Sequence, residues 1–205
     1  MACRTRVSLW SICACGRRPR QGAAMRNARG FTLLELMVVL IIVAIMLGIA
    51  IPDFHTVLLN RRLNGLIDNL YNSLNYARST ALSNDEPVTV CPLGSAGGTT
   101  CGSNWNAGWI VVKQPPQGTS AVLNTTVLSA NGPTLNSVPI GSGSSVTQIT
   151  FNGLGLLSTT QTLLVACDSR GSSAARAISV YATGFIQASN TPGMAADGTT
   201  SLTCP

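Results

Sequence analysis

One acidic side chain stands inside the most apolar segment of the chain. Glu35 follows Gly30 by five positions, at the start of an apolar stretch that reaches Ile51. Burying a carboxylate in hydrocarbon costs about 2 kcal/mol or more, so an acid kept there is expected to have a function. A cut after Gly30 would create an amine on Phe31, one helical turn from Glu35. The residues therefore predict a charge pair between this amine and the Glu35 carboxylate, within one chain or between neighbouring subunits.

The apolar stretch, residues 31–51, is long enough to cross a membrane. At about 1.5 Å per residue in a helix, it matches a hydrocarbon core of about 30 Å. A secretory signal peptide fits less well, because its apolar region has about 7 to 15 residues and ends in a small-residue cleavage site. The apolar stretch could also serve as a plain membrane anchor that is not cleaved. We expect a transmembrane helix over residues 31–51.

The basic residue, the Gly-Phe junction and the Thr-Leu-x-Glu sequence resemble the class III signal of type IV pilins and type II secretion pseudopilins. This resemblance implies that a prepilin peptidase cleaves after Gly30 and methylates Phe31 as the new N-terminus. It also implies that Glu35 acts in assembly, and that residues 31–51 become the helical core of a pilus. Residues 1–30 are then a basic leader. Met25 offers a later start, and on that alternative residues 1–24 are not translated.

Charge is divided unevenly between the leader and the rest of the chain. The leader holds seven of the thirteen basic residues and no acid, so six basic and seven acidic side chains remain, a charge of −1. The formal charge of +6 therefore gives no support to nucleic-acid binding by the mature chain. The leader arginines favour a cytoplasmic N-terminus in a single-pass inner-membrane protein whose C-terminal domain lies in the periplasm.

Four cysteines follow the leader, and three lie within it. An even number of thiols in an oxidising periplasm predicts disulfides, and four cysteines allow three pairings. We favour Cys91 with Cys101, which closes a short Gly-rich loop, and Cys167 with Cys204, which ties the tail to a strand. A zinc site is disfavoured, because the four have no Cys-x-x-Cys spacing and no His nearby. No metal and no other cofactor is predicted.

The residues after the apolar stretch change to an amphipathic pattern. Apolar side chains recur every three to five positions through residues 52–84 with polar ones between them, which predicts a helix with one face to bury. The predicted face consists of Phe54, Leu58, Leu63, Leu66, Ile67, Leu70, Leu74, Ala77 and Ala81. The sequence Asn-Asp-Glu-Pro over residues 84–87 should end the helix.

Residues 85–205 are typical of an antiparallel β domain. Short runs rich in β-branched and aromatic residues are separated by Gly, Ser, Pro and Asn. The expected strands cover residues 88–91, 109–113, 125–128, 146–151, 163–167, 177–181 and 185–188. The fold class is therefore α+β, with a long N-terminal helix, half membrane segment and half amphipathic, packed on a C-terminal antiparallel β domain.

Several motifs resemble the GspH/FimT family of minor pilins and pseudopilins. They are Tyr76-Ala77-Arg78-Ser79, Cys91-Pro92, the Cys-Gly-x-x-Trp-x-x-Gly-Trp stretch from Cys101 to Trp109, Phe151-x-x-x-Gly155, Cys167-x-x-x-Gly171 and Arg176-x-Ile178-x-Val180-x-x-x-Gly184. The resemblance implies a pilin fold and favours a minor pilin of a type IV pilus, in the assembly-initiating tip complex. A GspH-like pseudopilin of a type II secretion system is the first alternative. A FimT-like DNA receptor for natural transformation is the second.

On the favoured reading, the partners are proteins and lipid. The resemblance implies contacts with prepilin peptidase, inner-membrane lipid before assembly, the inner-membrane assembly machinery, other minor pilins and the major pilin. The final location is then the pilus, or fimbrium.

DNA binding is disfavoured, because FimT-type receptors have a Gly-Arg-x-Arg pattern where this chain has Gly-Phe-Ile-Gln over residues 184–187. Arg170 and Arg176 remain as weak phosphate contacts. No enzyme is expected, since the chain has one His, His55, and no nucleophile motif. Trp105 and Trp109 are expected to pack in the domain rather than to stack on a ligand.

Overall fold

The computed structural model describes residues 30–94, 98–114, 120–140 and 145–204, with the backbone alone for residues 49–53. The predicted leader, residues 1–30, lies outside the described residues except for Gly30. The chain divides into two compact units, the first ending at Ile45 and the second beginning at Met46. One helix, α1 (Leu33–Asn84), contributes residues to both units.

The C-terminal end of α1 is fixed by its own backbone. After Asn84, Asp85 takes a left-handed conformation with a φ of 52°. The Glu86 amide then donates a hydrogen bond to the Ala81 carbonyl oxygen at 3.3 Å, which closes the last turn in a Schellman arrangement. The helix end predicted from the breaker sequence is therefore confirmed.

The amphipathic part of α1 buries most of its predicted face. The buried members are Leu63, Leu66, Ile67, Leu70, Leu74, Ala77 and Ala81. The prediction was wrong for Phe54 and Leu58, whose side chains are 67% and 38% exposed. The main core receives its first α1 side chain at Leu63, so these two earlier positions lie ahead of the part of the helix that the sheets cover.

Two four-stranded sheets make up the rest of the second unit, within the described residues. The first has the strand order β3-β2-β1-β5 and the second β4-β6-β7-β8. The elements are β1 (Val88–Pro92), η1 (Trp105–Ala107), β2 (Gly108–Lys113), β3 (Ala121–Val127), β4 (Thr134–Pro139), β5 (Ile149–Phe151), β6 (Thr162–Cys167), η2 (Ser172–Ala174), β7 (Arg176–Val180) and β8 (Ile186–Ala188). Every strand pairing is antiparallel, and the predicted α+β fold class is confirmed.

Strand β4 was not predicted from the sequence. Its residues, Thr-Leu-Asn-Ser-Val-Pro, include three polar side chains and end in proline, and Leu135 alone is fully buried. The strand forms because it pairs along β6, from Thr134 opposite Cys167 to Pro139 opposite Thr162. This partner is distant in sequence, so no local sequence pattern predicts the strand.

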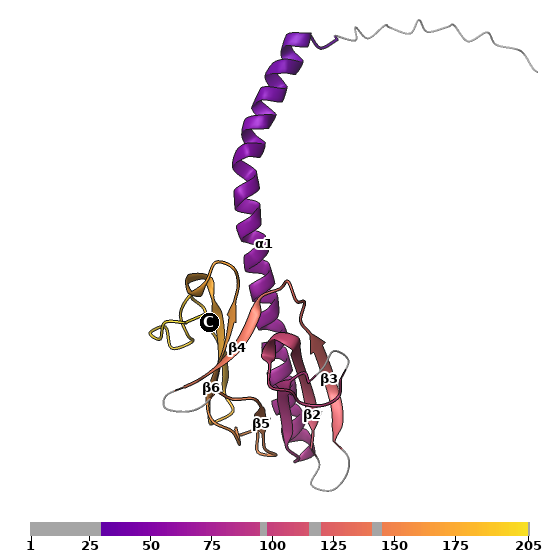
Figure 1. Cartoon of the computed structure of the whole chain (residues 1–205), viewed down its shortest axis with the longest axis vertical. Helices are drawn as coiled ribbons and strands as arrows, with labels where there is room; N and C mark the ends of the chain where they lie inside the picture. Colours follow the sequence, from indigo (N-terminus) through magenta and orange to yellow (C-terminus); the bar gives the residue numbers. More distant parts are fainter. Residues whose placement is uncertain (1–29, 95–97, 115–119, 141–144, 205) are drawn as a thin grey trace, which may run out of the picture. The chain divides into compact units, whose positions relative to one another are not determined.

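One core joins α1 to the inner faces of both sheets. Trp109 and Phe151 from the first sheet and Leu164 from the second are at most 1% exposed. Trp105 in η1 belongs to the same core, and its indole N–H donates to the Val146 carbonyl oxygen at 3.1 Å. The packing roles predicted for the two tryptophans are confirmed. Figure 1 shows the second half of α1 between the sheet that holds β2 and β3 and the sheet that holds β4 and β6.

Candidate functional site

The N-terminal segment places Glu35 in the first turn of α1. The Thr32 hydroxyl oxygen accepts a hydrogen bond from the Glu35 amide at 3.2 Å, and the Thr32 carbonyl oxygen accepts one from the Leu36 amide at 3.2 Å. Thr32 and Glu35 thus have the spacing of a capping box, where an acid is favoured beside the positive end of the helix dipole. The Thr-x-x-Glu signal is present in the sequence but was not recognised. The predicted pair with the Phe31 amine requires cleavage after Gly30 and stays a prediction.

The large apolar side chains of Phe31, just ahead of α1, and of the first part of α1 are exposed on all sides. Their exposed fractions run from 44% at Val43 to 82% at Phe31. The set consists of Phe31, Leu33, Leu34, Leu36, Met37, Val38, Val39, Leu40, Ile41, Ile42, Val43, Ile45, Met46 and Leu47. A helix that is apolar all round is expected to be buried in an assembly or a membrane.

Within the ranges that the structure describes, no helix meets the length and hydropathy needed to span a membrane. The transmembrane helix over residues 31–51 stays a prediction.

Two disulfides close loops over the outer faces of the sheets. Cys91 in β1 is bonded to Cys101, with Cα atoms 5.5 Å apart, and Cys167 in β6 is bonded to Cys204, with Cα atoms 5.9 Å apart. Cys91 belongs to a buried apolar cluster of the first sheet, while Cys167 and Cys204 belong to one of the second sheet. Strand alternation places both clusters on the faces opposite the main core. The pairing favoured from the sequence is confirmed.

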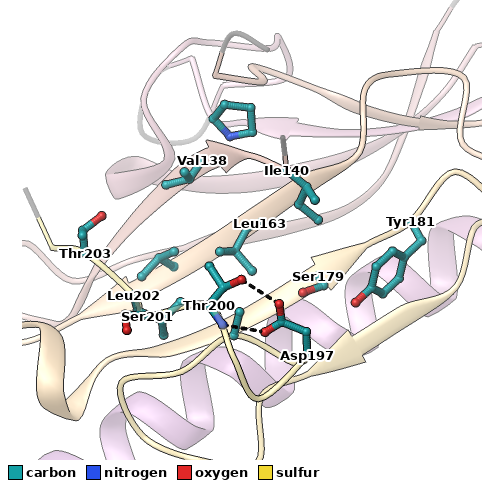
Figure 2. A pocket seen from close by; sticks show the side chains of 13 residues that line it. Val138, Ile140, Leu163, Ser179, Tyr181, Asp197, Thr200, Ser201, Leu202 and Thr203 are labelled. Carbon is teal, nitrogen blue, oxygen red and sulfur yellow. Dashed lines mark hydrogen bonds between the residues drawn. The ribbon is translucent and has the colours of Figure 1, made fainter. Parts of the chain in front are cut away.

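A pocket of about 240 Å³ lies between the outer face of the second sheet and the C-terminal tail. Val138 from β4, Leu163 from β6 and Leu202 from the tail supply apolar lining (Figure 2). Tyr181, which follows β7, and Asp197 supply polar groups to the same pocket (Figure 2). The Cys167–Cys204 disulfide ties the end of this tail back to β6, so the bridge helps to hold the pocket together.

The Asp197 carboxylate is occupied by its own turn. One oxygen accepts from the Thr199 and Thr200 amides at 3.1 and 3.0 Å, and the other accepts from their hydroxyl groups at 3.0 and 2.6 Å. The bonds from Thr200, followed by those from Thr199, lower the pKa of Asp197 below its ordinary range. Four accepted bonds use the lone-pair positions of a carboxylate, so Asp197 shapes the tail and keeps no free acceptor for a ligand.

Three of the sequence motifs meet beside the last turns of α1. The Arg78 guanidinium donates to the Gly155 carbonyl oxygen at 3.0 Å and to the Thr183 carbonyl oxygen at 3.4 Å. Gly184 has a φ of +73°, and a Cβ there would collide with the Gly155 carbonyl oxygen. Arg78 therefore joins the helix to a loop of each sheet, and the motif glycines are required by this close approach.

The two arginines proposed as DNA contacts have partners within the domain. The Arg170 guanidinium pairs with the Asp168 carboxylate at 2.7 Å and donates to the Asn60 side-chain oxygen on α1 at 2.8 Å. Burial raises the pKa of Asp168, but the hydrogen bonds and charge of Arg170 outweigh it and lower this pKa overall. Arg176 donates to the Asn190 carbonyl oxygen at 3.1 Å. Arg170 thus supports the domain, which leaves less of its charge available to a phosphate.

His55 lies exposed on α1. Across the described residues, no three His, Cys, Asp or Glu side chains come together as a metal site would require. The groups that the structure does organise are a capped apolar helix, two disulfide-closed faces and the tail pocket.

Two family models match the chain. A model described as type II transport protein GspH matches residues 66–184, which is more than half of the chain. A model described as a prokaryotic N-terminal methylation motif matches residues 25–51 and includes Gly30, Phe31 and Glu35. The domain and the N-terminal segment are therefore matched separately.

Solved structures similar to this chain include two crystal forms of the type IV minor pilin FimU from Pseudomonas aeruginosa. One is 23% identical with a TM-score of 0.49, over 62% of this chain and 87% of that chain. The other is 22% identical with a TM-score of 0.48, over 62% of this chain and 91% of that chain. No curated protein matches the chain.

Proposed function

The chain belongs to the GspH family of type II transport proteins, and from this membership we propose that it is a minor pilin of a type IV pilus. The observation that carries the proposal is the exposed apolar surface from Phe31 to Leu47, ahead of a domain with a complete core of its own. A domain that folds on itself does not need this helix surface. The surface is therefore available for membrane lipid and then for other subunits.

Assembly is the mechanism that this arrangement supports. Burying one large apolar side chain contributes about 1.5 to 3 kcal/mol, so the fourteen exposed side chains together favour burial by tens of kcal/mol. Keeping Glu35 in hydrocarbon costs about 2.5 to 3.5 kcal/mol, which is small beside that gain. Membrane and fibre core both bury the apolar surface, and the pair between Glu35 and a Phe31 amine favours the fibre and fixes register.

The proposal sets out a route for the protein. Prepilin peptidase cleaves after Gly30 and methylates Phe31, while residues 31–51 hold the protein in the inner membrane with the β domain in the periplasm. The assembly machinery then moves the subunit from lipid into the pilus, beside other minor pilins and the major pilin. We place it in the tip complex that initiates assembly.

Intact mass of the membrane-extracted protein tests this processing. The measured mass is expected to match a chain that begins at a methylated Phe31. The substitution Gly30→Leu should leave the leader attached, because the peptidase must approach the backbone at this position closely. Gly65→Leu, at a position in α1 where an added Cβ likewise meets nothing, is the matched control for the added side chain. A mature form that still carries Arg29 would contradict the proposal.

A GspH-like pseudopilin of a type II secretion system is the second candidate, favoured by the description of the family model itself. Deletion of the gene separates the two. Loss of surface pili with normal secretion supports the pilus, and the reverse result supports the secretion system. DNA reception has less support, because Arg170 is already bonded to Asp168 and Asn60.

A further inference from the structure

Strand edges expose unpaired backbone groups, which invite pairing with other chains unless something protects them. In the first sheet, the outer edge of β5 is covered by the loop that follows it. Phe151 forms a bridge with Leu157, and the Ser158 amide donates to the Thr150 carbonyl oxygen at 2.8 Å. The chain itself therefore satisfies this edge.

Both edges of the second sheet are protected by other means. Strand β8 has three residues, which is too short to offer much pairing. Strand β4 ends at Pro139, and its Leu135 amide donates to the Asn106 side-chain oxygen at 2.7 Å. Proline and a side-chain partner are two of the devices that limit pairing at an edge.

The remaining edge, β3, lacks these devices. Its seven residues contain no charged side chain and no proline, and Val127 near its end is 57% exposed. Four of the seven are the β-branched residues that favour strands. Among the described residues, none pairs with the side of β3 that faces away from β2.

A bulge affects the beginning of β3 and leaves its end regular. The register with β2 shifts between Val111 and Val112, which leaves Leu123 without an opposite residue. From Asn124 to Val127 the pairing with β2 is continuous. Backbone groups point to alternate sides along a strand, so about half of this segment's donors and acceptors face outward.

We propose that an extended, uncharged segment of a neighbouring pilin-like subunit adds to β3 as a fifth strand of the first sheet. The inference rests on the proposed function, which supplies such neighbours. The free groups of an edge are backbone donors and acceptors, which an extended backbone satisfies and a helix, already paired internally, does not. A segment without charge is favoured because β3 offers no counter-charge to a side chain that becomes buried beside it.

A single introduced thiol tests this contact in the full chain. The four cysteines that follow the leader are all in disulfides, so Thr125→Cys adds the only free thiol of the processed protein. A benzophenone maleimide on this thiol is irradiated in membranes and in sheared fibres, and the cross-linked peptide is identified by mass spectrometry. Ser158→Cys, an exposed hydroxyl residue in the loop that covers the β5 edge of the same sheet, is the matched control. We expect a several-fold higher adduct yield at position 125, on one defined segment of another pilin-like subunit.

Amide hydrogen exchange tests the backbone pairing itself. Amides within residues 124–127 should exchange at least about tenfold more slowly in fibres than in the detergent-extracted subunit, while those in β4 should not change. Equal adduct yields at positions 125 and 158 in both membranes and fibres, or unchanged exchange in β3, would overturn the proposal. A cross-link to residues 121–127 of a second copy would overturn the proposed occupant. An adduct with a pilin-like subunit in membranes, with no protein in fibres, would support the edge contact and overturn the minor-pilin proposal.

Discussion

The apolar side chains from Phe31, just ahead of α1, to Leu47 in its first half are exposed, whereas the second half of α1, from Leu63 to Ala81, presents one buried face. Both halves are rich in Leu and Ile, but their patterns differ. The second half alternates apolar and polar positions, and its stripe meets the two sheets. The first half has no polar face, so the fold of one chain leaves it uncovered. The comparison teaches that one helix can serve folding at one end and association at the other.

The largest expected effect is on the stability of the domain, and it compares one leucine from each half of α1. Leu70 is fully buried, and Leu70→Ala should destabilise the domain by about 2 to 5 kcal/mol, because it leaves a cavity in the core. Leu40→Ala, in the exposed half, should leave the unfolding midpoint unchanged. Urea unfolding of the processed chain in detergent can be followed by the fluorescence of Trp105 and Trp109, which are buried in the core. Equal shifts for the two variants would break the comparison.

The two disulfides test what stabilises the domain that the second half of α1 helps to form. Replacing Cys167 and Cys204 by Ala should cost about 4 kcal/mol in the chain-entropy account, and replacing Cys91 and Cys101 about 3 kcal/mol. The difference follows from sequence separations of 37 and 10 residues. The same urea experiment measures both pairs against the wild type. A larger loss from the shorter loop would show that local packing, not chain entropy, sets the contribution.

Substitution of Glu35 tests the role of the first half of α1 in association with other subunits. Glu35→Ala should leave the amount in the membrane unchanged or higher, since it removes the cost of burying an acid. Its amount in sheared fibres should fall by roughly fivefold if the charge pair contributes about 1 kcal/mol. Asp68→Ala changes an exposed acid in the second half of the helix and is the matched control. Equal fibre levels for wild type and Glu35→Ala, measured by immunoblot, would show that the pair is dispensable.

The smallest expected effect is a dependence of domain stability on pH. The pKa of Asp168 is lowered in the folded state, against about 3.9 when unfolded. This carboxylate therefore stabilises the domain above about pH 4, and the contribution is lost as the pH falls through the lower folded pKa. Urea unfolding between pH 6 and pH 2 should show a shallower loss of stability for Asp168→Asn than for the wild type. Arg170→Gln removes the groups that lower this pKa and leaves burial, which raises it, so the carboxylate should no longer contribute to the loss of stability as the pH falls.

Local signals account for what was predicted about the fold. The helix periodicity, the breaker sequence after Asn84 and the β-rich runs each act within a few residues. The helix end is confirmed, and each predicted run contains a strand, although β3 is longer and β5 shorter than predicted. The cysteine pairing also followed from simple rules, because one pair closes a short loop and the other ties the tail to a strand. The N-terminal cap of α1 at Thr32 also has a local signal, the Thr-x-x-Glu spacing, but it was not predicted.

Contacts between distant residues account for what was missed. Strand β4 exists because β6 pairs with it, and Phe54 and Leu58 are exposed because the sheets begin to cover α1 further along. Arg170 was predicted as a weak phosphate contact, yet it donates a hydrogen bond to Asn60 on α1, 110 positions away. None of these partners is marked by spacing or composition near the residue concerned.

The sequence by itself determined that this protein has an apolar N-terminal segment with one acid, an amphipathic helix and a β domain. Those properties depend on residue type and on the short-range spacing of apolar residues, which do not depend on how the chain folds. Only the tertiary structure decided which helix positions are covered, that Arg78 joins both sheets and which sheet edge stays open. The physical reason is that burial and strand pairing depend on where distant segments meet, and a linear pattern does not contain that information.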